Sequence, residues 1–336
     1  MSLVLARPVM EGQTMMNKSS LPTIERVAKE WLKGKKDESE NNSQVSQIWL
    51  KDGTKSPKAI IPIQPNTVAD SMKKQHHYSS RKPQVPGIIE QALAVYSAPG
   101  EILGAGAQIN VWNPVVEEQD EFSLAQISIK NGENQETNII EAGWHVLPSL
   151  YGDTKTRLYI YWTGGMGTGC YNNFCDGFEQ IAEDVTLGGQ LHLSAYDGDQ
   201  VDITIVIQRG TGAHWHLMIN GRRIGYWLRL YFNHLRLSGS RVEWGGKVSN
   251  TRPQNRHTTT SMGSGHLADE GFRKASYFHN LQIEDLTDGE SLKPVPSLNL
   301  TTLTTNTNCY NIVFPILNSP SRGFYYGGPG FNPNCP

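Results

Sequence analysis

Long apolar runs are missing from this 336-residue sequence. No stretch approaches the roughly 18 residues that a helix needs to span a bilayer, which excludes an integral membrane protein. Charge is also scarce, at 18% of residues against roughly a quarter in an average protein. The 30 Lys and Arg residues and 32 Asp and Glu residues leave a net charge of −2, so electrostatics give no reason to expect nucleic acid or an anionic membrane as a partner. Glycine is abundant (33 residues), and a glycine-rich, charge-poor chain favours short strands and tight turns over long surface helices.

A recognisable secretory signal is also missing, because the apolar stretch at residues 2–6 ends at Arg7 and a signal needs about 7–15 apolar residues. We therefore expect either a cytosolic protein or a sequence that begins after its leader. The few cysteines favour the second alternative, and they are Cys170, Cys175, Cys309 and Cys335. An even, locally pairable set indicates two disulfides and an oxidising compartment, although composition alone does not exclude four buried free thiols. Sequons at Asn17, Asn41 and Asn299 fit secretion, but such triplets often occur by chance.

The first 85 or so residues differ in character from the rest. Apolar residues at helical spacing between Ile24 and Leu32 predict a short helix, and a polar run follows at residues 35–43. Residues 47–50 and 59–63 resemble short strands, and the polar stretch 73–83 resembles a linker. The sequence thus predicts a small mixed α+β segment with its linker over residues 1–76, followed by a large domain over residues 77–336.

The large domain alternates apolar and polar residues almost throughout. Asn220-Gly221 between two such runs predicts a hairpin with a type I′ turn. The alternating segments are 107–112, 123–129, 158–162, 190–196, 201–208, 215–219 and 222–227. Many antiparallel strands without a helical period or an internal repeat predict an all-β domain, an antiparallel β-sandwich of jelly-roll type.

Several familiar signals have a simpler explanation. The glycine-rich stretch 164–169 lacks the lysine of a P-loop and opens no helix, so we interpret it as a loop. His214 and His216 share a strand face, but two histidines without a third ligand do not indicate a metal site. The stretch 261–266 contains hydroxyls and a histidine without the strand–turn–helix setting of a serine hydrolase. No metal and no cofactor are expected.

Two strands place charged residues beside glycines. In residues 139–146, Glu141, Gly143 and His145 share the face opposite Trp144. In residues 242–248, Glu243, Gly245 and Lys247 likewise share the face opposite Trp244. Glycines beside charged groups fit a groove that a ligand backbone could enter, because the missing side chains leave room above the sheet. An ordinary solvent face with exposed charges explains the pattern equally well.

Motifs in order along residues 75–336 resemble the neprosin family of plant proteins, whose founding member is a secreted glutamic endopeptidase that cleaves after proline. The motifs include Glu141-Ala142-Gly143-Trp144, Leu150-Tyr151-Gly152-Asp153, Thr168-Gly169-Cys170-Tyr171-Asn172, Val242-Glu243-Trp244-Gly245-Gly246, Met262-Gly263-Ser264-Gly265-His266 and Tyr325-Tyr326-Gly327-Gly328-Pro329-Gly330. The resemblance implies two packed antiparallel sheets, an N-terminal activation peptide removed in acid, and the disulfides Cys170–Cys175 and Cys309–Cys335. It also implies a secreted protein with a proline-containing peptide or protein as substrate.

The resemblance further implies two catalytic glutamates, of which this sequence retains one, Glu141. The second family glutamate ends Trp-Gly-Gly-Glu-Val, and here that position is Lys247. A carboxylate protease needs one ionised and one neutral carboxyl, and a lysine cannot share a proton in this way. We expect Lys247 to form an ion pair with Glu141 and to impair or abolish activity. Glu243 is a possible substitute, but four residues of strand span about 13 Å.

Two functional hypotheses remain open. The first is a glutamic endopeptidase that cleaves after proline at acid pH through Glu141. The second is a non-catalytic protein that uses the same groove to bind proline-rich peptides or cell-wall polymers. We expect a secreted monomer in both cases, with Asn299 as a glycosylation site.

Overall fold

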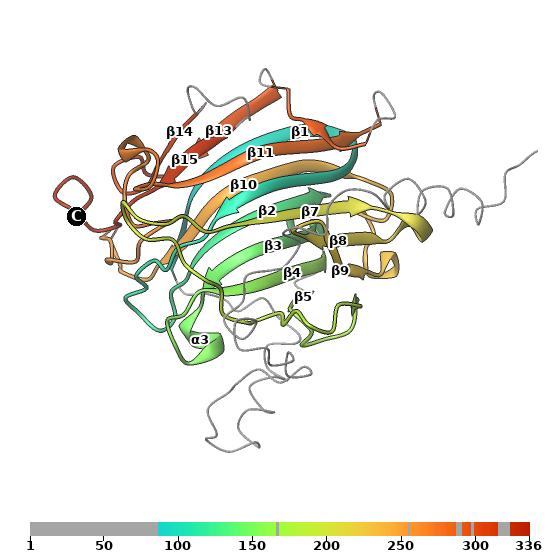
Figure 1. Ribbon diagram of the computed structural model, residues 1–336, viewed down its shortest axis with the longest axis horizontal. Helices are drawn as coiled ribbons and strands as arrows, with labels where there is room; N and C mark the ends of the chain where they lie inside the picture. Colours follow the sequence, from blue (N-terminus) through green and yellow to red (C-terminus); the bar gives the residue numbers. More distant parts are fainter. Residues whose placement is uncertain (1–86, 166–167, 255, 287–290, 297–298, 315–322) are drawn as a thin grey trace, which may run out of the picture. The chain divides into compact units, whose positions relative to one another are not determined.

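The computed structural model describes residues 87–336 apart from 166–167, 255, 287–290, 297–298 and 315–322 (Figure 1). The chain divides into two units, residues 1–42 and 43–336, and all described residues belong to the second. The helix and strands expected before residue 64, the linker at residues 73–83 and the boundary at residues 76 and 77 lie outside the described residues.

The described chain consists mainly of strands. These are β1 (Ile88–Asn110), β2 (Ser123–Asn131), β3 (Asn138–Val146), β4 (Arg157–Gly165), β5 (Thr168–Tyr171), β6 (Phe178–Gln180), β7 (Asp202–Arg209), β8 (Trp215–Ile219), β9 (Arg222–Trp227), β10 (Gly239–Asn250), β11 (Ser276–Asp285), β12 (Lys293–Pro294), β13 (Leu300–Thr304), β14 (Asn311–Val313) and β15 (Phe324–Gly327). The helices are α3 (Pro148–Tyr151) and the 3-10 turns η2 (Asn134–Glu136), η3 (Thr211–Ala213), η4 (Arg229–Tyr231) and η5 (Ala268–Glu270). Among these residues, no helix has the length and apolar character to cross a membrane.

All strand pairings are antiparallel, and β1 connects two layers. The first half of β1 pairs with β10, which continues through β2, β3 and β4 to β5. After an irregularity between Ser97 and Ile102, the second half of β1 pairs with β7 and β11. The β7 side continues through β8 and β9 to β6. A single long strand thus takes part in both layers, which the ribbon shows as the strongly curved β1 (Figure 1).

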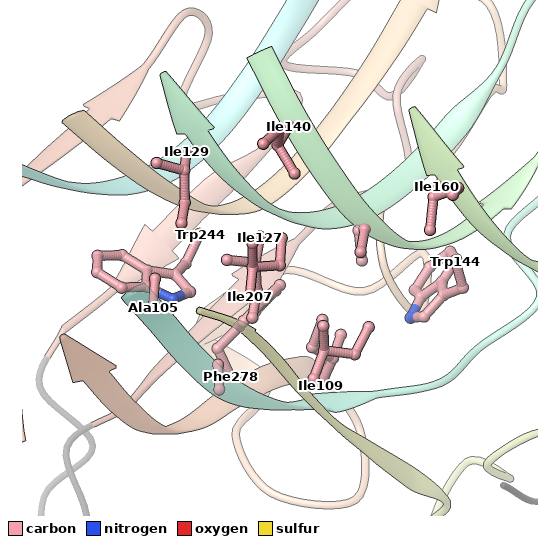
Figure 2. Close-up of a cluster of buried hydrophobic side chains, with 14 of the residues drawn as sticks. Ala105, Ile109, Ile127, Ile129, Ile140, Trp144, Ile160, Ile207, Trp244 and Phe278 are labelled. Atoms are coloured by element: carbon pink, nitrogen blue, oxygen red, sulfur yellow. The ribbon is translucent and has the colours of Figure 1, made fainter. Parts of the chain in front are cut away.

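The main core lies between the layers. Figure 2 shows side chains of β2, β3 and β4 pointing toward those of β1, β7 and β11. All of the following are buried: Ile127, Ile129, Ile140, Trp144, Ile160, Ile109, Ile207 and Phe278. The inward residues of β3 are the alternating set expected from its sequence, because successive side chains of a strand point to opposite faces. The predicted all-β antiparallel sandwich is confirmed.

The predicted hairpin is also confirmed. β8 and β9 pair across Asn220 and Gly221, which have φ of 49° and 75°, the two positive values that a type I′ turn requires. The prediction of a strand at residues 190–196 is wrong, since Gln190 makes only an isolated bridge to Arg157. Residues 192–196 form no strand, although their sequence alternates.

Candidate active site

The strand register brings the predicted site residues to one face of the sheet, opposite the main core. Glu141 of β3 pairs with Ser128 of β2, which pairs with Glu243 of β10. Further along the strands, the paired rows are Gly143, Gln126 and Gly245, and then His145, Leu124 and Lys247. The alternation that turns Trp144 and Trp244 into the core therefore turns both glutamates and Lys247 to the opposite face.

This face is buried. Glu141 is 8% exposed, and Gln126 and His145 are buried still more deeply. The interpretation as a solvent face with exposed charges is therefore wrong. Buried polar groups need partners, and those partners define the site.

Glu141 is held by neutral donors. The hydroxyl of Tyr159, on neighbouring β4, donates to its Oε1 at 2.5 Å. Burial, followed by the Glu141 carboxylate, raises the pKa of Tyr159 well above its ordinary value, so this hydroxyl keeps its proton and remains a donor. Tyr161, on the same face, also has a raised pKa because of burial and Glu141.

Gln126 lies between Glu141 and Lys247, and these neighbours set the orientation of its amide. With the nitrogen toward Glu141, the amide donates to both carboxylate oxygens, at 2.8 Å to Oε1. The amide oxygen then accepts from Lys247 Nζ at 2.6 Å. The opposite orientation would set an acceptor against the carboxylate and donors against the ammonium, so Gln126 connects the two residues in one direction only.

Lys247 forms its ion pair with Glu243, not with Glu141 as we expected from the sequence. Lys247 Nζ lies 3.2 Å from Glu243 Oε2, so the long side chain spans the separation that four residues of strand impose on the backbone. Among the described residues, Glu141 forms no ion pair within 4 Å.

Glu243 holds two further cations besides Lys247. Lys130 of β2 is 2.7 Å from its Oε2, and Arg241 Nε is 2.9 Å from its Oε1. Burial raises the pKa of Glu243, but Lys247, Lys130 and Arg241 outweigh burial and hold it at about 2. The carboxylate is thus ionised across the range in which acid peptidases work.

The pKa of Lys130 is lowered as well, which for a lysine disfavours the charged form. Burial, followed by the nearby charge of Lys247, lowers its pKa to about 8, although Glu243 and Glu141 act to raise it. Positive charge is therefore crowded here: three cations share one carboxylate, and two of them contact the same oxygen.

Aromatic side chains lie beside Glu141 on the β3–β4 side. The His145 ring stacks on Tyr159, with centroids 4.2 Å apart, and its Nε2 is 3.0 Å from the hydroxyl of Tyr151. Burial, with a smaller contribution from Arg157, lowers the pKa of His145 to about 3, so the ring is neutral above that pH. The ring centroids of Tyr171 and Tyr161 are 4.9 Å apart.

The two glycines on this face do not leave open space. A Cβ at Gly143 would lie 1.9 Å from the carbonyl oxygen of Ala125, and one at Gly245 would lie 2.2 Å from that of Ala92. Gly245 also has φ of 142°, a value that other residues rarely adopt. Both glycines are required because neighbouring strands approach closely, and the expected room above them is not present.

The other predicted sites have mixed outcomes. The structure confirms the disulfides Cys170–Cys175 and Cys309–Cys335, with Cα atoms 6.2 Å and 5.3 Å apart. Asn299 is exposed just before β13. Neither His214 nor His216 belongs to a group of three or more ligands among the described residues, and the one group found, His257 with Cys309 and Cys335, uses sulfurs already joined in a disulfide.

Gln126 and Lys130 are the site residues that sequence reasoning missed. Both lie on the polar face of the alternating segment 123–129 and its continuation to residue 131. That alternation was a usable signal, because consecutive strands usually pair and β2 directly precedes β3.

Comparison with known proteins supports one family. The Neprosin family model matches residues 119–329, which include the whole candidate site. A crystal structure of scytalido-glutamic peptidase with a transition state analog inhibitor is 12% identical, covering 70% of this chain and 97% of that one, with a TM-score of 0.41. SCP-B, a member of the Eqolisin family of peptidases in complex with the tripeptide Ala-Ile-His, is 11% identical, covering 71% and 97%, with a TM-score of 0.37. Both TM-scores lie below 0.5, so these two structures do not indicate a function for this chain.

Proposed function

Since this chain belongs to the Neprosin family, we propose that it is a glutamic-peptidase homologue that takes proline-containing peptides, and that its cleavage after proline at acid pH is strongly impaired. Glu141 is the retained catalytic carboxylate. One observation carries the proposal: where the family has its second glutamate, the ammonium of Lys247 lies against Gln126 and Glu243. At this position an ammonium therefore stands in place of the carboxyl that would share a proton with Glu141.

The impairment follows from acid–base chemistry. Hydrolysis by two carboxyls needs one group to take a proton from water and another to give a proton to the substrate. Two neighbouring carboxyls provide both forms, because the charge on one favours the protonated form of the other. Lys247 instead favours the ionised form of Glu243. The chain therefore retains a base without the matching acid.

Glu243 is a poor substitute for the missing acid. Its pKa of about 2 leaves it without a proton at pH 3 and above, and three cations surround its oxygens. A general acid must carry a proton at the working pH. The sequence-based suggestion that Glu243 replaces the second glutamate therefore finds no support in the electrostatics of the site.

A second function, peptide binding without cleavage, is favoured by the contacts of Glu141. Tyr159 and Gln126 donate to its carboxylate, which thereby serves as a fixed acceptor and not as a free base. Such a site retains the aromatic and polar contacts of a peptide-binding face without performing the chemistry.

We also propose a domain division and a cellular location for this chain. We assign residues 1–76 to an activation-peptide-like segment and residues 77–336 to the peptidase-type domain. The two disulfides are compatible with an oxidising, extracellular location, and exposed Asn299 in its Asn-Leu-Thr triplet would accept a glycan there. We propose a secreted monomer.

The test is cleavage of a quenched fluorescent peptide containing proline, measured from about pH 2.5 to about pH 7 with the full chain. We expect little cleavage by the wild type. Lys247→Glu should increase the rate by about 100-fold or more with an acidic optimum, since a positioned general acid typically contributes that much. Adding Glu141→Gln should abolish the gain. Lys155→Glu, a change at an exposed lysine in the loop before β4, is the matched control and should leave the rate unchanged.

Other outcomes would contradict the proposal. Strong wild-type cleavage that Glu243→Gln abolishes would place the acid at Glu243. Strong wild-type cleavage that Lys247→Glu leaves unchanged would refute the two-carboxyl argument for this chain. If no variant cleaves, the binding function is favoured.

A further inference from the structure

The candidate site carries more positive than negative charge. Lys130, Lys247 and Arg241 all contact Glu243, and among the described residues the second carboxylate whose charge acts on Lys130 is Glu141. Three cations against two carboxylates leave one positive charge without a counter-charge. The Arg241 side chain is 39% exposed and its charge is solvated, whereas the Lys130 and Lys247 side chains are largely buried. Burying positive charge without a full counter-charge is costly, so these two lysines favour an incoming anion.

The donors are also in excess. Lys247 has three N–H donors, of which Gln126 and Glu243 accept two. Lys130 has three, and among the described residues Glu243 is its one acceptor. The side chains of Lys130 and Lys247 are 20% and 14% exposed, so both remain in contact with solvent. At least one donor of each lysine is therefore available to a ligand.

We infer that this chain binds peptides through a free C-terminal carboxylate, which Lys247, assisted by Lys130, would accept beside Glu141. This inference rests on the proposed function and specifies its ligand: chain ends, not internal peptide bonds. It means that replacing the family glutamate by lysine changes what the site recognises and does not merely remove a catalytic group.

The charge of the ligand is what selects a chain end. An internal peptide carbonyl is neutral, so it would leave the excess positive charge uncompensated. A carboxylate neutralises that charge and forms charge-assisted hydrogen bonds, which are roughly twice as strong as neutral ones. The lowered pKa of Lys130 agrees with this view, because burial and then the charge of Lys247 disfavour its charged form, and a bound anion would favour it.

The test compares two fluorescein-labelled peptides with the same proline-containing sequence, one ending in a free carboxylate and one in an amide. Binding to the full chain is followed by fluorescence anisotropy at pH 6. We expect the acid to bind about tenfold more tightly or better, as one charge-assisted hydrogen bond provides. Lys247→Met should abolish the preference, and Lys247→Arg should retain it. Lys155→Met is the matched control and should behave as the wild type, and circular dichroism confirms that each variant is folded.

Each contrary result has a distinct meaning. Equal affinity of the wild type for the acid and the amide would overturn this inference and leave the proposed function standing. No binding of either peptide would overturn both. Binding of a trigalacturonate probe in place of the peptide acid would assign the site to an acidic sugar and would also overturn the inference. A preference that survives Lys247→Met would place the carboxylate elsewhere.

Discussion

Glu243→Gln offers a quantitative test of the site electrostatics through stability. The Glu243 side chain is 5% exposed, and its pKa is about 2 in the folded chain against an ordinary 4.5. At about 1.4 kcal/mol for each pH unit, this difference amounts to about 3 kcal/mol of stability at neutral pH. Because the folded pKa is the lower one, the stabilisation is complete above about pH 5 and is lost as the pH falls from about 5 toward 2.

The assay is urea unfolding of the wild type and Glu243→Gln at several pH values from about 7 down to about 2. At pH 7 the variant should be about 3 kcal/mol less stable, since Lys130, Lys247 and Arg241 then lack their shared counter-charge. The difference should shrink steadily below about pH 5 and be small near pH 2, where the wild-type carboxyl is itself becoming protonated. Glu118→Gln, at an exposed loop position, is the matched control and should have little effect.

Two results would refute this reasoning. A loss that stays constant with pH would mean that Glu243 stabilises the chain through shape and packing and not through its charge. A loss below about 1 kcal/mol at pH 7, as is usual for surface ion pairs, would mean that solvent screens the cluster and that the three cations do not hold the pKa of Glu243 near 2.

Three further predictions concern neighbouring residues. Lys247→Met should raise the pKa of Lys130 above its value of about 8 because it removes a like charge, which NMR of reductively ¹³C-methylated protein would detect; an unchanged pKa would show that the two ammonium groups do not interact. The His145 ring should show no titration by NMR between about pH 5 and pH 8, because burial holds its pKa at about 3; a midpoint near 6.5 would mean that water reaches the ring. Gly143→Ala should cost more than about 3 kcal/mol in urea unfolding, since its Cβ would overlap a carbonyl oxygen of the next strand. Gly152 has φ of 75°, and a Cβ there would have no other atom within 4 Å, so Gly152→Ala should cost only about 1 kcal/mol. Equal losses of stability in Gly143→Ala and Gly152→Ala would contradict the close approach of the strands at Gly143.

Local patterns in the sequence predicted the fold class and the orientation of the site strands. Alternation at residues 139–146 and 242–248 correctly separated Trp144 and Trp244 from Glu141 and Lys247, because side-chain direction in a strand depends only on sequence parity. Alternation failed at residues 192–196, where a polar–apolar pattern exists without a partner strand. Pairing, not pattern, decides whether such a segment becomes a strand.

The partners of each site residue depended on register, which the sequence of a single strand does not contain. The backbone separation of about 13 Å between Glu243 and Lys247 argued against Glu243 as a substitute for the second glutamate. It does not prevent the long lysine side chain from reaching Glu243. We expected Lys247 to reach Glu141 directly, but the register places Gln126 between them. The same limitation explains the glycines: whether a missing Cβ leaves room or admits a neighbouring backbone depends on what lies across the sheet.

The position of Gln126 makes residue 247 and Glu141 dependent on each other. A primary amide has donors at one end and an acceptor at the other, so the group at position 247 decides which end faces Glu141. Lys247 takes the oxygen and directs the nitrogen to Glu141, an arrangement that suits an ionised carboxylate. An ionised glutamate at position 247 would take the nitrogen and direct the oxygen to Glu141, which then forms a hydrogen bond only if it is protonated. Replacing Lys247 by Glu therefore introduces a second carboxyl and also reverses the amide between the two, so that one ionised and one protonated group is the best-bonded combination, the combination that two-carboxyl hydrolysis needs.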